Sequence, residues 1–545
     1  MKKVIIIASS LIVVILLFFL GINFLGGNPI EKANEYVSKV EEKISEEGII
    51  NGICIIQNDG SLICEDKTID VNSNIASSGS IVIIDGKISN VDITVDNKNL
   101  ININNEIVIN NKKIEEKIVK GDSSGAEIPK LYTNKLIPVI YNGTNWQVAD
   151  TSLEWYDYDK QNWANAVILK PGITKEVNDI VNVDNEIQGM FVWIPRFEYK
   201  IDGVYGKKTD DEVSQEYPGI IDINFISKNT SVATKGYTVH PAFTFNNREL
   251  SGIWASKFNT SADKESECYN VDLNMSSEDI ANNYDNILTK CNNESIKPYV
   301  IPNARSLRFQ NAHNEYITAI KMGLYVSNMD SHMSKNSEFT SVIYLSQSKY
   351  GKYGNDNYVG NDKYIKYNNN SNYLTGCGNN SLLSSLSNEC SEFVTSYGME
   401  ASTTGNITGV YDMFSTASKR VMGFLETDLE IETTNDYTSA GFIKNPNNIY
   451  ADIFKLNENV TNYDIYNELE INTYMTNICS NDRCKGQGLD EFYRWEEPES
   501  SHTFNFPTIE NPWIIRGSYS QFHFMADRGI AESNVTFRIT LIDNQ

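Results

Sequence analysis

The chain has 545 residues and a net charge of −25, with 46 Lys and Arg residues against 71 Asp and Glu. Its 41% hydrophobic and 21% charged residues are typical of a folded protein, which excludes a disordered chain and a membrane protein with many spans. The negative charge argues against nucleic acid as a partner, because phosphate binding needs basic surface that displaces counterions.

The N-terminus carries an apolar run without charged residues. Lys2 and Lys3 precede this run, which extends over residues 4–25. A membrane span needs about 20 residues and a secretory signal is usually shorter, so we predict a signal-anchor helix at residues 1–27 that contacts the lipid bilayer. A cleaved signal peptide is the alternative. The paired lysines predict a single-pass cell-membrane protein with a cytoplasmic N-terminus and residues 28–545 extracellular.

The eight cysteines form four local couples, whose members are 10, 23, 13 and 5 positions apart in the chain. An even number of cysteines in close couples behind an export signal predicts four sequential disulfide bonds. A zinc site is the competing interpretation, but the chain has no C-x-x-C motif and five scattered histidines. The expected bonds are Cys54–Cys64, Cys268–Cys291, Cys377–Cys390 and Cys479–Cys484.

Residues 28–120 are expected to form a helix followed by a β-rich stalk module. Apolar residues at helical spacing run from Ile30 to Ile44, and Gly48 ends the pattern. Short alternating runs separated by turn residues then predict antiparallel strands. The expected strands lie within residues 52–56, 61–64, 80–84, 91–95 and 100–109. An anchor helix before a small sheet is similar in plan to pilin-like proteins, so a minor subunit of a pilus-like assembly is one alternative function.

A short linker at residues 121–130 leads into a long segment, 131–545, which begins with Trp-rich β sequence. Asn142–Trp146 has the composition of a hairpin tip, and residues 306–322 and 337–346 are the better helix candidates. We expect the main domain to have its core at residues 190–545.

Six segments, taken in order, resemble the formylglycine-generating, sulfatase-modifying factor family. They are Phe191–Arg196, Leu250–Phe258 preceded by Phe243, Lys335–Phe339 leading into Tyr344–Leu345, Gly409–Met413, Arg516–Tyr519 and Phe537–Arg538. The resemblance covers about residues 190–545 and implies a C-type-lectin-like fold. The expected fold class is therefore α+β, with a single N-terminal transmembrane helix, a small antiparallel β stalk and a large C-type-lectin-like domain.

The sequence departs from this family where its chemistry resides. The resemblance implies a copper-binding cysteine pair just after Arg516–Tyr519, but residues 520–524 contain no cysteine. Cys479 and Cys484 have the required spacing, yet they precede that motif. His313 and His332 stand alone, without the histidine trio of the iron-binding relatives. We therefore expect no enzymatic activity. A divergent oxidase with free, metal-binding thiols is the alternative.

Residues 347–380 have the composition of a binding loop. Tyrosines supply rigid contact area and Asn, Ser and Gly supply adaptable hydrogen bonds, a combination that also suits stacking on sugar rings. Codon bias in a tolerant surface loop explains the same composition equally well. The candidate ligand-binding residues are Tyr350, Tyr353, Tyr358, Tyr364, Asn355 and Asp356.

No cofactor is expected, because no known metal motif is present. Asp356, Asp362 and their Asn neighbours offer oxygen ligands that would suit Ca²⁺, although no twelve-residue calcium loop accompanies them. The sequence thus predicts a membrane-anchored extracellular protein, adhesin- or lectin-like, that recognises a glycan or a protein surface.

Overall fold

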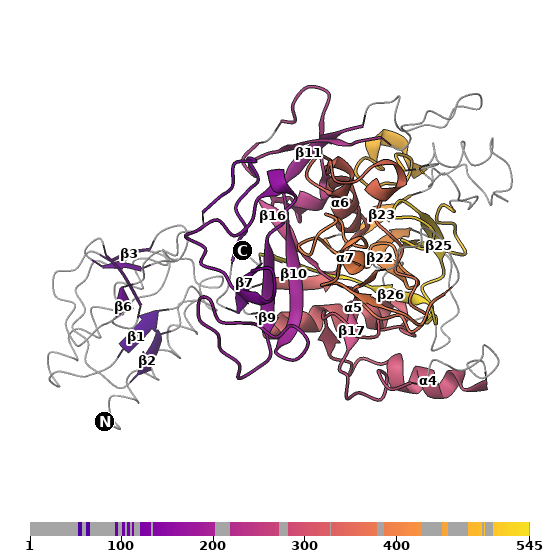
Figure 1. Cartoon of the computed structure of the whole chain (residues 1–545), viewed down its shortest axis with the longest axis horizontal. Coiled ribbons are helices and arrows are strands. Elements are labelled where there is room, and N and C mark those ends of the chain that lie inside the picture. Colours follow the sequence, from indigo (N-terminus) through magenta and orange to yellow (C-terminus); the bar gives the residue numbers. More distant parts are fainter. Residues whose placement is uncertain are drawn as a thin grey trace, which may run out of the picture. The chain divides into compact units, whose positions relative to one another are not determined.

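The computed structural model divides the chain into two compact units, Met1–Ile118 and Val119–Gln545 (Figure 1). It describes the backbone of six short strands in the first unit and most of the second unit. The described residues are 53–56, 62–65, 93–95, 101–103, 106–109, 112–113, 120–131, 135–201, 219–230, 232–271, 282–326, 329–378, 386–426, 449–455, 478–492, 495 and 505–543.

The first unit contains two small antiparallel sheets. In one sheet β1 pairs with β2, and Cys54 lies opposite Cys64 in the register. The other sheet has the order β3-β4-β5-β6. The strands β1 to β5 fall within or overlap four of the five predicted runs, whereas β6 lies outside all of them. Residues 80–84 and the predicted helix at 30–44 lie outside the described residues. The strands are β1 (Ile53–Ile56), β2 (Leu62–Glu65), β3 (Ile93–Val95), β4 (Ile101–Ile103), β5 (Glu106–Ile109) and β6 (Lys112–Lys113).

The second unit is built on a seven-stranded sheet with the order β19-β27-β16-β10-β9-β7-β8. The strands β7 and β8 form a hairpin, which confirms the predicted tip at Asn142–Trp146. All nine residues of the central strand β10 are buried, so both of its faces are packed against other parts of the unit. Its largely apolar sequence suits this position. The strands are β7 (Leu136–Tyr141), β8 (Trp146–Val148), β9 (Asn165–Leu169), β10 (Ile187–Pro195), β16 (Gly252–Ser256), β19 (Met329–Met333) and β27 (Ile539–Asp543).

A five-stranded sheet forms the other large layer. Its order is β23-β22-β24-β25, with β26 also paired to β22. It consists of β22 (Ser418–Leu425), β23 (Asp452–Phe454), β24 (Trp513–Arg516), β25 (Phe524–Asp527) and β26 (Val535–Phe537). Smaller sheets contain β11 (Phe197–Lys200), β12 (Asp222–Phe225), β13 (Thr238–Val239), β14 (Thr244–Phe245), β15 (Arg248–Glu249), β17 (Ser261–Ala262), β18 (Pro298–Tyr299), β20 (Cys377–Gly378) and β21 (Ser391–Glu392).

The helices are short. The α-helices are α4 (Tyr284–Cys291), α5 (Ala312–Ile320), α6 (Asn336–Ser346) and α7 (Ser396–Met399). The 3₁₀ turns are η1 (Tyr158–Lys160), η2 (Pro241–Phe243), η3 (Lys321–Tyr325), η4 (Lys352–Gly354), η5 (Gly360–Lys363) and η6 (Ser480–Asp482). The helices α5 and α6 lie at the two helix candidates of the sequence, although α5 is shorter than expected.

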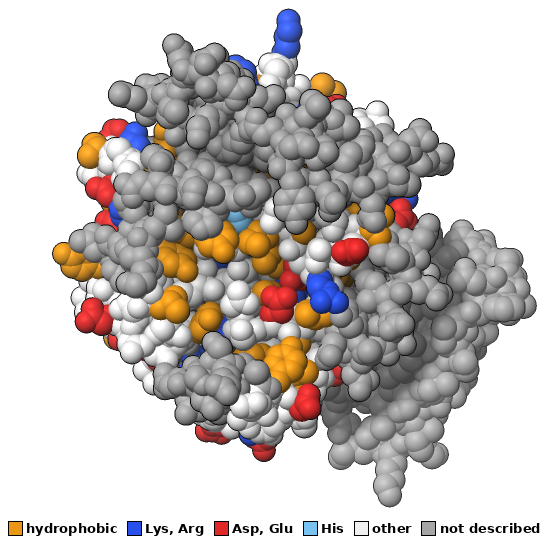
Figure 2. Space-filling view, turned by 90° about the vertical axis from the view of Figure 1, so that its right-hand side faces the viewer, with side chains coloured by type: hydrophobic (Ala, Val, Ile, Leu, Met, Phe, Trp, Pro, Cys, Tyr) orange, Lys and Arg blue, Asp and Glu red, His pale blue; other side chains and the backbone are white. Residues whose placement is uncertain are grey.

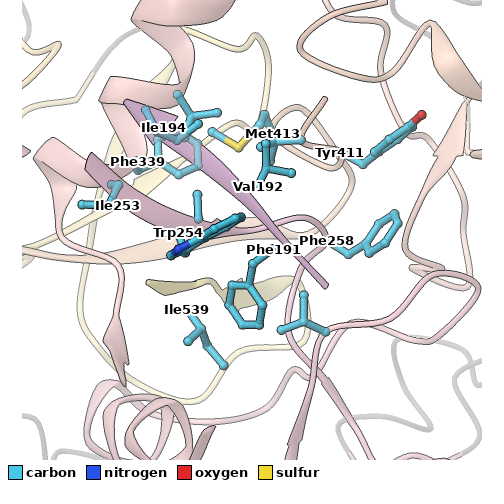
Figure 3. Packing of buried hydrophobic residues seen from close by; sticks show 14 of the residues in the cluster. Phe191, Val192, Ile194, Ile253, Trp254, Phe258, Phe339, Tyr411, Met413 and Ile539 are labelled. Carbon is cyan, nitrogen blue, oxygen red and sulfur yellow. The ribbon is translucent and has the colours of Figure 1, made fainter. Parts of the chain in front are cut away.

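The helix α6 is buried along its whole length between the two larger sheets, where it contacts β10 and β16 of one and β22 of the other (Figure 1). Figure 3 shows how Phe339 of this helix lies beside Ile194 of β10, with Ile253 of β16 and Met413 nearby. Burying these side chains stabilises the unit by about 1.5–3 kcal/mol for each large apolar residue.

Three of the four predicted disulfide bonds are confirmed: Cys268–Cys291, Cys377–Cys390 and Cys479–Cys484. Such bonds are consistent with an extracellular protein. The side chains of Cys54 and Cys64 lie outside the described part, so that bond stays a prediction.

The predicted fold class and location are wrong for this structure. Strands predominate in the described residues, with few helices, rather than the α+β mixture that was expected. No helix among them is long and apolar enough to cross a membrane. The longest, α6, has 11 residues, whereas a span needs about 20. Residues 1–27, where the spanning helix and the single-pass location were predicted, lie outside the described residues.

Candidate functional site

The predicted binding loop follows α6 and includes η4 and η5. The structure places its candidate residues at different depths: Tyr350 and Tyr364 are buried, Tyr353, Asn355 and Tyr358 are half-buried, and Asp356 is exposed. The loop is thus partly core and partly surface, which composition alone could not distinguish.

Tyr350 anchors the start of this loop to the interior. Its ring lies 4.4 Å from that of Phe225, between centroids, and its carbonyl oxygen accepts a 2.7 Å hydrogen bond from Trp163 Nε1. Lys349 Nζ lies 4.7 Å from the centroid of the Tyr350 ring. Tyr350 therefore holds the loop in place, and its ring is not available to stack on a ligand.

A buried lysine supports the middle of the loop. Lys352 Nζ donates to Glu400 Oε2 at 2.8 Å and to the Glu400 carbonyl at 2.7 Å, and it lies 4.7 Å from the centroid of the Tyr358 ring. Burial lowers the pKa of Lys352 to about 8 despite Glu400. The Tyr358 hydroxyl donates to the Gly405 carbonyl at 2.6 Å, and burial, with the Glu400 carboxylate, raises the pKa of this tyrosine to about 12.

The end of the loop packs on a second aromatic cluster. The ring centroids of Tyr353 and Tyr364 are 5.6 Å apart, and Tyr364 lies 6.3 Å from Phe522. The side chain of Gln521 accepts a 3.1 Å hydrogen bond from the Ile365 amide. Contacts from distant segments on both sides hold the loop backbone in one conformation.

The rim of the loop is polar and exposed. Its exposed residues are Asp356, Asn357, Val359, Gly360, Asn361 and Asp362, and Val359 has 73% of its surface exposed. The Asp362 carboxylate accepts from Lys366 Nζ at 2.6 Å, so this predicted calcium ligand has a protein partner. On the face shown in Figure 2, hydrophobic side chains form several separate patches, with uncharged surface and a few acidic and basic side chains between them.

In contrast to the exposed rim, Asp412 and Arg538, which belong to the motifs that resemble the sulfatase-modifying factor family, lie in the interior. Asp412 is buried in a left-handed conformation (φ 61°), and its carboxylate accepts from Asn368 Nδ2 at 2.8 Å, from the Gly376 amide at 3.0 Å and from the Asn259 amide at 3.2 Å. Arg538 donates to Asn259 Oδ1 at 3.0 Å. These contacts fasten separate segments together, which is a structural role.

Lys257, in the segment that follows β16, is a second buried cation of this kind. Its Nζ donates to Asn165 Oδ1 at 2.9 Å and to the carbonyls of Ile407 and Gly409 at 2.8 and 2.7 Å. Burial lowers its pKa well below the ordinary value for lysine. The Gly409–Met413 motif is therefore held by a lysine rather than turned towards a ligand.

One group of potential metal ligands occurs among the described residues. Cys479, Cys484 and Asp490 bring one ligand atom each within 4.8 Å of one another. The two cysteines are joined by a disulfide bond, whereas metal binding requires thiolates. Cys479 and Cys484 therefore do not supply the free thiol pair that a divergent oxidase needs.

Sequence reasoning missed the residues that support the loop from elsewhere in the chain. Glu400 and Gln521 lie 48 and 156 positions from their partners Lys352 and Ile365, and no local pattern signals such pairs. No family model and no curated protein matches the chain. The resemblance to sulfatase-modifying factors therefore stays a prediction.

Proposed function

We propose that the chain is a non-catalytic, lectin-like binding protein that recognises a glycan through the exposed rim of the loop at residues 350–364. One observation carries the proposal: buried contacts at both ends of the loop fix its backbone, so the exposed polar residues between them are preorganised. A rigid polar surface loses little conformational entropy when it binds a ligand.

The chemistry of the rim supports a sugar as the ligand. Asp356, Asn357 and Asn361 offer donors and acceptors for hydroxyl groups, and the half-buried rings of Tyr353 and Tyr358 lie beside them along the chain. Aromatic faces next to amide and carboxylate groups suit sugar rings, which present an apolar face with a polar edge. The disulfide bonds are consistent with the extracellular setting in which such ligands occur.

A test should change the rim and leave the buried tyrosines intact. We expect the full chain to bind members of a glycan array, and the double variant Asp356→Ala/Asn357→Ala to bind them about tenfold more weakly or worse, because at least two hydrogen bonds are lost. The matched control is Asn145→Ala/Glu265→Ala, which removes one exposed amide and one exposed carboxylate elsewhere. Equal binding by both double variants, or no glycan bound by the full chain, would overturn the proposal.

A further inference from the structure

A small, partly open pocket with a cavity volume of about 20 Å³ lies away from the loop, beside the Cys268–Cys291 disulfide bond. Three stretches of chain form it: the end of β17 with the following turn, the cysteine at the end of α4, and residues 305–309. The lining residues on which the argument rests are Cys268, Tyr269, Cys291, Arg305, Arg308 and Phe309.

Arg308 is a buried cation whose hydrogen bonds are incomplete. Its Nη1 donates to the Ser533 carbonyl, while its Nε is buried without a hydrogen-bond partner. The guanidinium lies 3.7 Å from the centroid of the Tyr373 ring, which fixes its orientation. A buried donor without an acceptor is costly, so the site gains free energy from any ligand that supplies one.

Arg305 places a second positive charge at the same pocket and is half-buried. Its Nη1 donates to the carbonyls of Tyr269 and Val271, both at 3.2 Å, and its guanidinium lies 5.9 Å from the centroid of the Tyr269 ring. These contacts hold Arg305 in place with one nitrogen, and an arginine has further N–H groups that suit an oxyanion.

Neither arginine forms an ion pair with a carboxylate in the part of the chain that the structure describes. The contrast with Arg420 is informative. That side chain is also buried, and it is neutralised by Glu315 at 2.8 Å and Asp527 at 2.7 Å. In a chain with a net charge of −25, two unneutralised guanidinium groups at one pocket indicate a site for an anion.

The backbone around the pocket is held in an unusual conformation. Phe309 and Tyr373 have φ angles of 59° and 57°, in the left-handed region that bulky residues seldom adopt. The Phe309 amide donates to the Glu532 carbonyl at 2.8 Å, and the Tyr373 carbonyl accepts from the Ser306 amide at 2.9 Å. Such strain persists where surrounding contacts enforce it, and it is frequent at ligand sites.

We propose that this pocket binds the oxyanion group of a small molecule, a carboxylate, sulfate or phosphate, between Arg305 and Arg308. The guanidinium groups would donate to the oxygens of the anion, while Tyr269 and Phe309 contact the uncharged part of the ligand. The cavity volume of about 20 Å³ is small, so we expect the oxyanion group itself to enter the pocket and the uncharged part of the ligand to lie at its mouth.

Isothermal titration calorimetry on the full chain tests this site. The probes are sodium glucuronate, glucose 6-sulfate and glucose 6-phosphate, with glucose and sodium chloride at matched ionic strength as negative controls. We expect saturable binding of at least one charged sugar and none of glucose. Binding of glucuronate alone identifies a carboxylate site, and binding of the sulfate or phosphate ester identifies a tetrahedral oxyanion; either result supports the proposal.

The deciding variant is Arg305→Gln, because Arg305 is half-buried and glutamine keeps a polar, uncharged side chain at this position. We expect an apparent affinity about tenfold weaker or worse, since a charge-assisted hydrogen bond is removed. Arg483→Gln is the matched control: Arg483 is also half-buried, and the change removes the same charge far along the chain, beside Cys484. Arg308→Lys keeps the charge and loses the planar fork, so intermediate binding is expected. No saturable binding of any charged sugar, or equal binding by the Arg305 and Arg483 variants, would overturn the proposal.

Discussion

His332 Nε2 lies 3.1 Å from both carboxylate oxygens of Glu338, and both side chains are buried. On its other side, His332 Nδ1 lies 2.6 Å from Asp330 Oδ1. Glu338 also accepts a 2.9 Å hydrogen bond from the Lys335 amide at the start of α6. The imidazole therefore connects β19 to the first turn of the buried helix, and its charge is expected to contribute to stability.

This arrangement predicts a dependence of stability on pH. Burial alone would lower the pKa of His332, but the carboxylates of Glu338 and Asp330 raise it to about 9. Since this value is above the ordinary 6.5, the stabilisation is complete below about pH 6.5 and is lost as the pH rises through about 9. The rise in the pKa of His332 on folding corresponds to a contribution of at most roughly 3 kcal/mol to the free energy of unfolding.

The measurement is urea-induced unfolding of the native chain and of His332→Gln between about pH 6 and about pH 10. We expect the variant to be less stable at the lower pH and the gap to shrink as the pH rises. Because other groups also titrate in this range, the informative quantity is the difference between the two proteins. A difference that is constant with pH would contradict the prediction.

The variant Tyr358→Phe should lower the stability of the loop without changing its binding of a glycan. The change removes the hydrogen bond to the Gly405 carbonyl and keeps the ring, so we expect about 1 kcal/mol less stability and unchanged glycan binding. Tyr397→Phe is the control, because Tyr397 is 54% exposed. Thermal unfolding and the glycan array together provide the test, and equal stability of the two variants would speak against the supporting role.

Gly252→Ala is expected to disturb the central sheet. A Cβ atom at Gly252 would lie 2.5 Å from the Ile194 carbonyl oxygen and 2.5 Å from the Trp193 ring, and the backbone neighbour cannot move away cheaply. Overpacking of this kind costs about 1–3 kcal/mol. Gly323→Ala is the control, since its Cβ would have no neighbour closer than 3.6 Å. Chemical denaturation of both variants gives the comparison, and similar midpoints would refute this account of the β10–β16 packing.

The disulfide bonds should contribute unequally because they close loops of different length. The sequence separation is 23 for Cys268–Cys291 and 5 for Cys479–Cys484. Loop-closure entropy then predicts that removal of the Cys268–Cys291 bond lowers the free energy of unfolding by about 1 kcal/mol more than removal of the Cys479–Cys484 bond. Thermal unfolding of the two paired Cys→Ala variants measures the difference. A larger loss from the shorter loop would show that native packing outweighs chain entropy here.

The sequence by itself determined the features that depend on near neighbours in the chain. Cysteines 23, 13 and 5 positions apart pair as their spacing indicated. The hairpin at Asn142–Trp146 lies where its turn residues predicted it, and the helix α6 coincides with the candidate at residues 337–346. Each of these features follows from contacts within one short stretch, so a local pattern was sufficient.

Only the tertiary structure decided which side chains face solvent and which cations keep a free donor. Tyr350 and Asp356 belong to one loop, yet one is buried and the other exposed, because segments far along the chain cover the first. Arg420 and Arg308 are both buried arginines. Among the described residues, Arg420 has two acidic partners, whereas Arg308 has none and keeps an unpaired Nε. Burial and pairing are properties of the folded surroundings, because they depend on contacts between residues tens to hundreds of positions apart.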